Sequence, residues 1–147
     1  MIKLTVNQEE LLRGLSSILG VSRDDLFNLI NFESAGWNPL ARNKISGARG
    51  LLQFTNTTAR NMGYASADDL VNKHSTIDSQ LEIPVYNYLK EFVPFTGKQS
   101  LYMAVFYPKY RYVSPNTSFG DKVKSQNPGI FTVQDYIDKV EGKKKLH

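Results

Sequence analysis

The segment spanning residues 24–34 constrains the fold most, because its apolar residues recur at the spacing of one helix face. Leu26, Leu29 and Ile30 stand at positions i, i+3 and i+4, which predicts a helix that buries this stripe in a core. Glu33 falls at position i+7 of the same stripe, where another apolar residue would be expected. Burial raises the pKa of a carboxyl group and favours its protonated form near neutral pH, as a general acid requires. The alternative is a surface glutamate that bends out to water at the helix end.

The rest of the chain also predicts helices, and we expect a mainly α fold. Helix starts are indicated at Asn7, Ser22 and Thr132, each followed three residues later by an acidic residue. Pro84 predicts a kink or break near Ile83 in a longer element that runs through Phe92. The stretch 107–131 is expected to be irregular, because prolines, glycines and asparagines interrupt any apolar period. A length of 147 residues suits one domain, residues 1–147, with its own core.

Composition excludes several classes of site. The chain has no cysteine, so it can hold neither a thiolate metal site nor a cysteine nucleophile. His74 and His147 lack partners at metal-ligand spacing, and we expect no metal and no cofactor. The net charge of +4 favours contact with a polyanion such as a bacterial cell wall, and no nucleic-acid-binding signature appears. No apolar run is long enough to cross a membrane, and no signal peptide is visible.

Four pieces of sequence follow in a fixed order from the acidic residue onward. They are Glu33-Ser34, Asn38-Pro39-Leu40-Ala41, Gly47-Ala48-Arg49-Gly50-Leu51-Leu52-Gln53 and Thr58-Ala59. The ordered set resembles the catalytic core of the soluble lytic transglycosylases, which are relatives of goose-type lysozyme. The resemblance covers roughly residues 20–110, and it implies a lysozyme-like single domain with a substrate cleft and Glu33 at the floor of that cleft.

The resemblance also implies an activity, which is cleavage of the β-1,4 bond between N-acetylmuramic acid and N-acetylglucosamine in peptidoglycan. Glu33 would act first as general acid and then as base, and the product would end in a 1,6-anhydro sugar. One alternative is a hydrolytic muramidase with the same bond specificity, which would need a second carboxylate. The candidates for that second acid are Asp68, Asp69, Asp78 and Glu82. Another alternative is a non-catalytic wall-binding or virion structural protein.

Further site residues are expected from the same resemblance. Ser34 would lie near the lactyl or acetamido group of the sugar, unless its hydroxyl bonds to its own helix. Gln53 would donate to and accept from sugar groups through its amide. The third family motif, normally Ala-Tyr-Asn, is altered here, and Phe106 falls at the tyrosine position. Tyr107 or Tyr102 could supply the missing hydroxyl instead.

Two more expectations concern the only tryptophan and the setting in which the protein works. Trp37 occupies an aromatic position of the family motif, and core packing is favoured there over stacking on a sugar. The chain also looks like phage-encoded members of the family, either a virion component or a lysis enzyme released from the host cytoplasm. Expected partners are peptidoglycan glycan strands and, for a virion component, other phage virion proteins. The protein is expected to be a monomer without membrane insertion.

Overall fold

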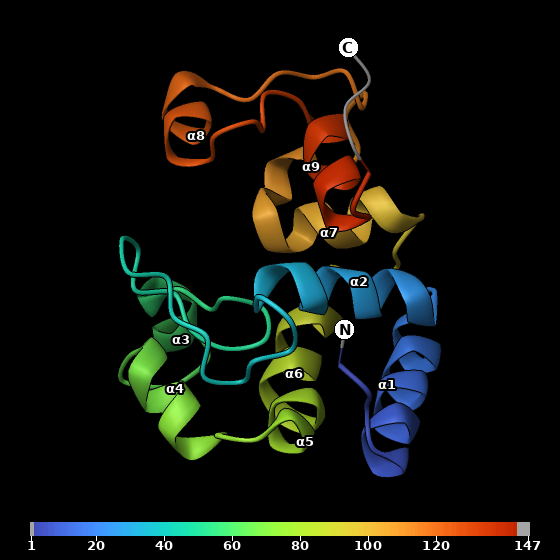
Figure 1. Cartoon of the computed structure of the whole chain (residues 1–147), viewed down its shortest axis with the longest axis vertical. Coiled ribbons are helices and arrows are strands. Elements are labelled where there is room, and N and C mark those ends of the chain that lie inside the picture. The colour runs from blue at the N-terminus through green and yellow to red at the C-terminus, as the bar shows by residue number, and fades with distance from the viewer. Residues whose placement is uncertain (1, 144–147) are drawn as a thin grey trace. The chain divides into compact units, whose positions relative to one another are not determined.

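The computed structural model describes residues 2–143, and its regular structure is helical (Figure 1). Among the described residues no strands pair into a sheet, and the only strand-like pairings are isolated bridges. The prediction of a mainly α fold is confirmed. The chain divides into two compact units, Met1–Phe95 and Thr96–His147. Within the described part of the chain, no helix combines the length and the apolar character that crossing a membrane requires.

The first unit contains most of the helices. In chain order these are α1 (Val6–Leu19), α2 (Arg23–Glu33), α3 (Asn56–Asn61), α4 (Ala67–Lys73), α5 (Ile77–Gln80), the π-helix η1 (Leu81–Val85), α6 (Tyr86–Leu89) and the 3₁₀-helix η2 (Lys90–Phe92). The long connection between α2 and α3 carries most of the sequence motif, and in Figure 1 it runs past α3 and α4.

Side-chain caps set the ends of the first two helices. Helix α1 begins after Thr5, whose hydroxyl accepts from the backbone N–H of Gln8 in a capping box. The sequence placed this start at Asn7, which was wrong, because Asn7 instead donates its side-chain amide to Asp78 at 2.6 Å. Gly20 ends α1 in the left-handed conformation. Ser22 caps α2 as predicted.

Pro84 does not break the helical path between residues 77 and 92. It lies inside η1, whose wider turn carries the chain from α5 into α6. A proline lacks the N–H of a regular helix and its ring crowds the preceding turn, so a π-helical turn is a way to accommodate it. The predicted irregularity near Ile83 is confirmed as a change of helix type.

The second unit consists of α7 (Lys98–Phe106), the 3₁₀-helix η3 (Pro108–Tyr110), α8 (Asp121–Gln126) and α9 (Val133–Val140). Helix α9 has the capping box predicted from Thr132 and Asp135. The sequence treated residues 107–131 as irregular throughout, which was wrong for α8. Helix α8 has no buried residue and no side-chain cap, so neither an apolar period nor a capping residue marks it in the sequence.

Candidate functional site

Glu33 is the last residue of α2, and its side chain is half-buried. The apolar stripe that precedes it is in the core, since Leu26, Leu29 and Ile30 are fully buried. The carboxyl group therefore stands at the edge of the core and is less buried than the stripe predicted. The C-terminal end of a helix carries partial negative charge, which disfavours a carboxylate, and α2 has no basic residue in its last turn. The helix end itself is therefore an unfavourable place for a negative charge.

Ser34 closes the end of α2 and holds the turn that follows. Its side chain is fully buried, and its hydroxyl donates to the carbonyl of Ile30 at 2.6 Å and accepts from the N–H of Trp37 at 2.9 Å. The alternative weighed for Ser34, a bond to its own helix, is confirmed. Contact with a sugar remains a prediction.

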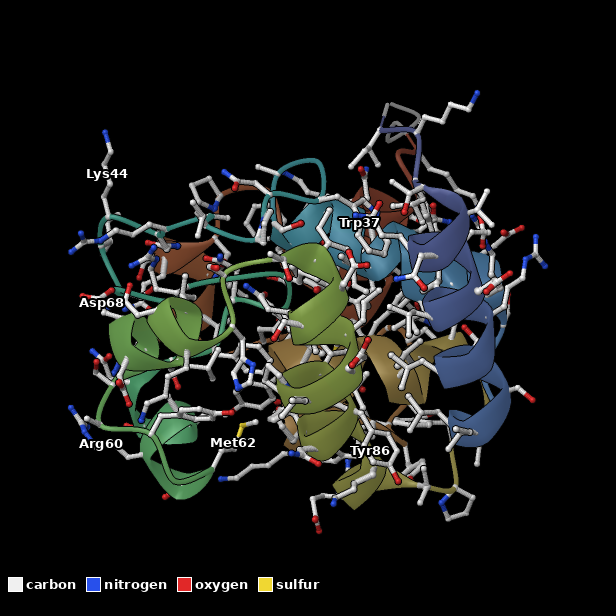
Figure 2. All side chains as sticks on the ribbon, turned by 90° about the horizontal axis from the view of Figure 1, so that it is seen from below. Trp37, Lys44, Arg60, Met62, Asp68 and Tyr86 are labelled. Atoms are coloured by element: carbon white, nitrogen blue, oxygen red, sulfur yellow. The ribbon has the colours of Figure 1, made fainter. Side chains whose placement is uncertain are left out.

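Trp37 packs in the core, as favoured from the sequence. Its side chain is 1% exposed, and its ring lies 5.3 Å from that of Phe27. Figure 2 places Trp37 beside α2. The indole N–H is buried and finds no acceptor among the described residues. An unsatisfied buried donor lowers stability by about 1–3 kcal/mol, so this position is not optimised for stability alone.

The Gly-Ala-Arg-Gly-Leu-Leu-Gln segment folds into a tight double turn. Arg49 forms isolated antiparallel bridges with Arg42 and with Phe54. Its guanidinium also binds Asp68 at the start of α4, at 2.6 Å. Gln53 is half-buried, and its side-chain N–H donates to the carbonyls of Gly50 at 3.1 Å and Ala41 at 3.4 Å. Its amide oxygen accepts no hydrogen bond from any described residue, which leaves this acceptor available to a ligand.

Gln80, at the end of α5, holds this segment in place through three hydrogen bonds that we call the Gln80 clamp. Its side-chain N–H₂ donates to the carbonyls of Pro39 at 2.7 Å and His74 at 2.8 Å. Its oxygen accepts from the N–H of Leu51 at 2.9 Å. Gln80 is fully buried, and its bond to Leu51 is buried as well, whereas the bonds to Pro39 and His74 are part-buried. No pattern in the sequence singles out Gln80, because its partners lie up to 41 residues away.

Two features require a glycine at position 50, its backbone conformation and its close approach to Gln80. Its φ is +82°, in the left-handed region that residues with a Cβ avoid. A Cβ built there would also lie 2.8 Å from the amide oxygen of Gln80. The structure thus shows a packing reason for a glycine here.

Backbone strain is concentrated in the same part of the chain. Among the described residues, the non-glycine residues with positive φ are Ala35 at 53°, Trp37 at 67° and Gln53 at 55°. All three lie within the motif that begins at Glu33. Each costs about 1–3 kcal/mol and persists only where surrounding contacts impose it, and such residues cluster at functional sites. The strain therefore marks this segment as a candidate site independently of any sequence resemblance.

Three of the four carboxylates considered as a second acid have structural partners. Asp68 binds Arg49, and Asp69 accepts from the backbone N–H of Ala65 at 2.9 Å, which lowers the pKa of Asp69. Asp78 accepts hydrogen bonds from side chains at the start of α1, and these bonds lower its pKa. Glu82 is exposed within η1.

His74 is a structural histidine at the end of α4. Its two ring nitrogens lie 2.9 Å from the hydroxyl of Tyr64 and 2.7 Å from that of Ser79. Burial, followed by the charge of Lys73, lowers the pKa of His74. Within the described residues, no group of three or more histidine and acidic side chains is placed to hold a metal ion. His147 lies outside the described residues.

The predicted aromatic site residues all belong to the second unit. Tyr102 is fully buried and meets the ring of Tyr136 edge to face, with centroids 6.5 Å apart. Phe106 is half-buried and stacks on Tyr136 at 4.3 Å. Tyr107 ends α7 and packs against Phe119, with centroids 5.7 Å apart. Each of the three thus has a packing role in this unit, and their contact with a substrate stays a prediction.

Comparisons of the chain with protein-family models, with curated proteins and with solved structures found no significant match.

Proposed function

We propose that this protein is a peptidoglycan lytic transglycosylase with Glu33 as its catalytic acid and base. The observation that carries the proposal is the placement of Glu33. It is a half-buried acid at the helix end where the dipole opposes its charge, followed directly by the strained motif segment. Partial burial and a helix C-terminus both act in the direction that a proton donor in glycosidic cleavage needs. The order of motif residues, which resembles that of lytic transglycosylases, supplies the substrate class.

In the proposed reaction, Glu33 donates its proton to the oxygen that links C1 of N-acetylmuramic acid to C4 of N-acetylglucosamine. The C1–O bond breaks through an oxocarbenium-like state, and the N-acetylglucosamine leaves with a free C4 hydroxyl. The ionised Glu33 then removes the proton from the C6 hydroxyl of the muramic acid, and O6 bonds to C1. No water is consumed, Glu33 returns to its protonated state, and the product is a 1,6-anhydro sugar.

The engagement of the other carboxylates supports the single-acid reaction over hydrolysis. Asp68, Asp69 and Asp78 each have a structural partner, so using any of them as a general base would disrupt a cap, an ion pair or a helix contact. The neutral amide of Gln53, whose oxygen remains available, suits a sugar ligand. The lysozyme-like arrangement with Glu33 at the floor of a cleft is part of this proposal.

The test is mass spectrometry of the muropeptides released from purified peptidoglycan. Products lighter by one water than reducing-end species are expected from the wild-type protein. Glu33→Gln keeps the shape of the side chain and removes the acid, so release should fall by about 10²- to 10⁴-fold. Glu10→Gln, on the exposed side of α1, is the matched control and should retain full release.

Three outcomes would refute the proposal. Reducing ends in place of anhydro ends would identify a hydrolytic muramidase, and Glu82→Gln would then test the remaining second acid. No release by the wild-type protein, or undiminished release by Glu33→Gln, would remove Glu33 from catalysis.

A further inference from the structure

A pocket of about 460 Å³ lies within the first unit, between the end of α3 and the stretch formed by α6 and η2. Asn61 and Met62 line it from one side, and Asn87, Tyr88 and Phe92 line it from the other. Figure 2 shows Met62 on the side of α3 that is turned toward the neighbouring helix. No residue of this pocket belongs to the motif that begins at Glu33, so the proposed reaction does not use it.

The pocket presents unused hydrogen-bonding groups from both sides. The side-chain amides of Asn61 and Asn87 form no hydrogen bond with any described residue, and both residues are exposed. Each amide offers two donors and one acceptor. Thr58 adds a hydroxyl, whose oxygen accepts from Thr55 at 3.0 Å and whose own proton remains available. Two amides and a hydroxyl, on helices that line opposite sides of the pocket, match a ligand rich in hydroxyl or acetamido groups.

The wall between these polar groups is aromatic and apolar. The rings of Tyr88 and Phe92 lie 5.2 Å apart at an interplanar angle of 48°, and both residues are half-buried. The thioether of Met62 adds a soft apolar surface. Small-molecule sites usually combine apolar and aromatic side chains with a few polar groups at defined positions. A pyranose ring has the matching surface, with C–H groups on its faces and hydroxyls around its edge.

The charges at the rim favour a neutral ligand. Lys90 and Glu91 both line the pocket, and their opposite charges balance. The ammonium group of Lys90 also lies 5.3 Å from the centre of the Tyr86 ring. A site selective for a polyanion would need an excess of positive charge, which this rim does not provide.

We infer that this pocket is a second glycan-binding site, which takes a β-1,4-linked N-acetylhexosamine unit of the strand whose cleavage is proposed for Glu33. The inference depends on the proposed function only for the identity of the natural polymer. The pocket is coupled to the motif by packing, because Phe54, which follows Gln53, meets the ring of Tyr88 edge to face at 6.0 Å. A strand that binds here would be retained near the motif between cleavage events.

The experiment is an NMR titration of ¹⁵N-labelled Glu33→Gln protein with the β-1,4-linked tetramer of N-acetylglucosamine, which this variant does not cleave. The side-chain amide signals of Asn61 and Asn87 should shift with saturation. Asn61→Ala combined with Asn87→Ala should weaken the binding measured at the Met62 methyl signal about tenfold, since each lost hydrogen bond contributes modestly. Asn72→Ala, an exposed asparagine of α4 outside the pocket, should leave binding unchanged.

The inference is overturned if the two amide signals stay fixed while the sugar is added, or if they respond to a peptidoglycan stem peptide and not to the sugar. Its failure is distinct from failure of the proposed function. Release of anhydro muropeptides without a response at Asn61 and Asn87 would refute only the second site. A response there without release of muropeptides would support the site and refute the transglycosylase.

Discussion

Replacing Gln80 by leucine tests whether the Gln80 clamp holds the candidate site together. The substitution keeps the size of the side chain and removes all three hydrogen bonds. The N–H of Leu51 would lose its partner, at a cost of about 2 kcal/mol, and the carbonyls of Pro39 and His74 would lose theirs, at about 1 kcal/mol each. Burial of the more apolar leucine side chain offsets about 1 kcal/mol of this loss in the free energy of unfolding. The free energy of unfolding should therefore fall by about 3 kcal/mol.

Urea denaturation measures this loss directly. With a denaturant slope of about 1.5 kcal/mol per molar, the midpoint should move down by about 2 M. Gln126→Leu is the matched control, because Gln126 is exposed at the end of α8 and should change stability by less than about 0.5 kcal/mol. Hydrogen exchange gives a local readout, since the N–H of Leu51 should lose protection. A Gln80→Leu protein as stable as the control, with Leu51 still protected, would refute the clamp.

The remaining predictions concern one glycine and one histidine. Gly50→Ala should destabilise the protein by clearly more than Gly20→Ala, because both impose a left-handed φ on alanine, at about 1–2 kcal/mol, but only the first brings a Cβ to 2.8 Å from Gln80. Equal losses by thermal denaturation would contradict the close approach. The lowered pKa of His74 means that the unfolded chain binds more protons, so stability should fall as pH drops below its ordinary value of 6.5. His74→Asn should flatten that slope in urea titrations from pH 7.5 to 5, whereas a slope unchanged from that of His147→Asn would rule out His74 as its source.

Local patterns predicted the helices well where a cap and an apolar stripe coincide. Ser22 and Thr132 were identified as caps from their own side chains and the acidic residue three positions on. At α1 two capping residues compete, and Thr5, which the sequence passed over, forms the box with Gln8. Helix α8 has neither signal and was missed. Helix propensity and capping depend on residues that are close in the sequence. They predict a helix correctly only where such local interactions determine the structure.

The candidate site could be predicted only in part for the same reason. The sequence placed Glu33 on the core stripe, but its half-buried state depends on the helix ending at this residue. The packing of Trp37 was predicted from the aromatic position that it occupies in the motif. Gln80 was not anticipated, because a glutamine in a helix is ordinary and only the fold brings it against Pro39 and Leu51. Long-range polar contacts of this kind produce no periodic pattern of residues in the sequence.

The strained segment after Glu33 has a consequence for anyone who would move this motif to another protein. Ala35, Trp37 and Gln53 resist the conformation that they adopt, so the segment does not encode its own shape. Part of that shape depends on Gln80, which lies well outside the contiguous motif and binds Pro39 and Leu51 within it. An excised peptide would adopt other backbone conformations. A graft of the motif without α5 would transfer the residues of the site but not their geometry. The smallest transferable unit is the motif together with the helix that holds it.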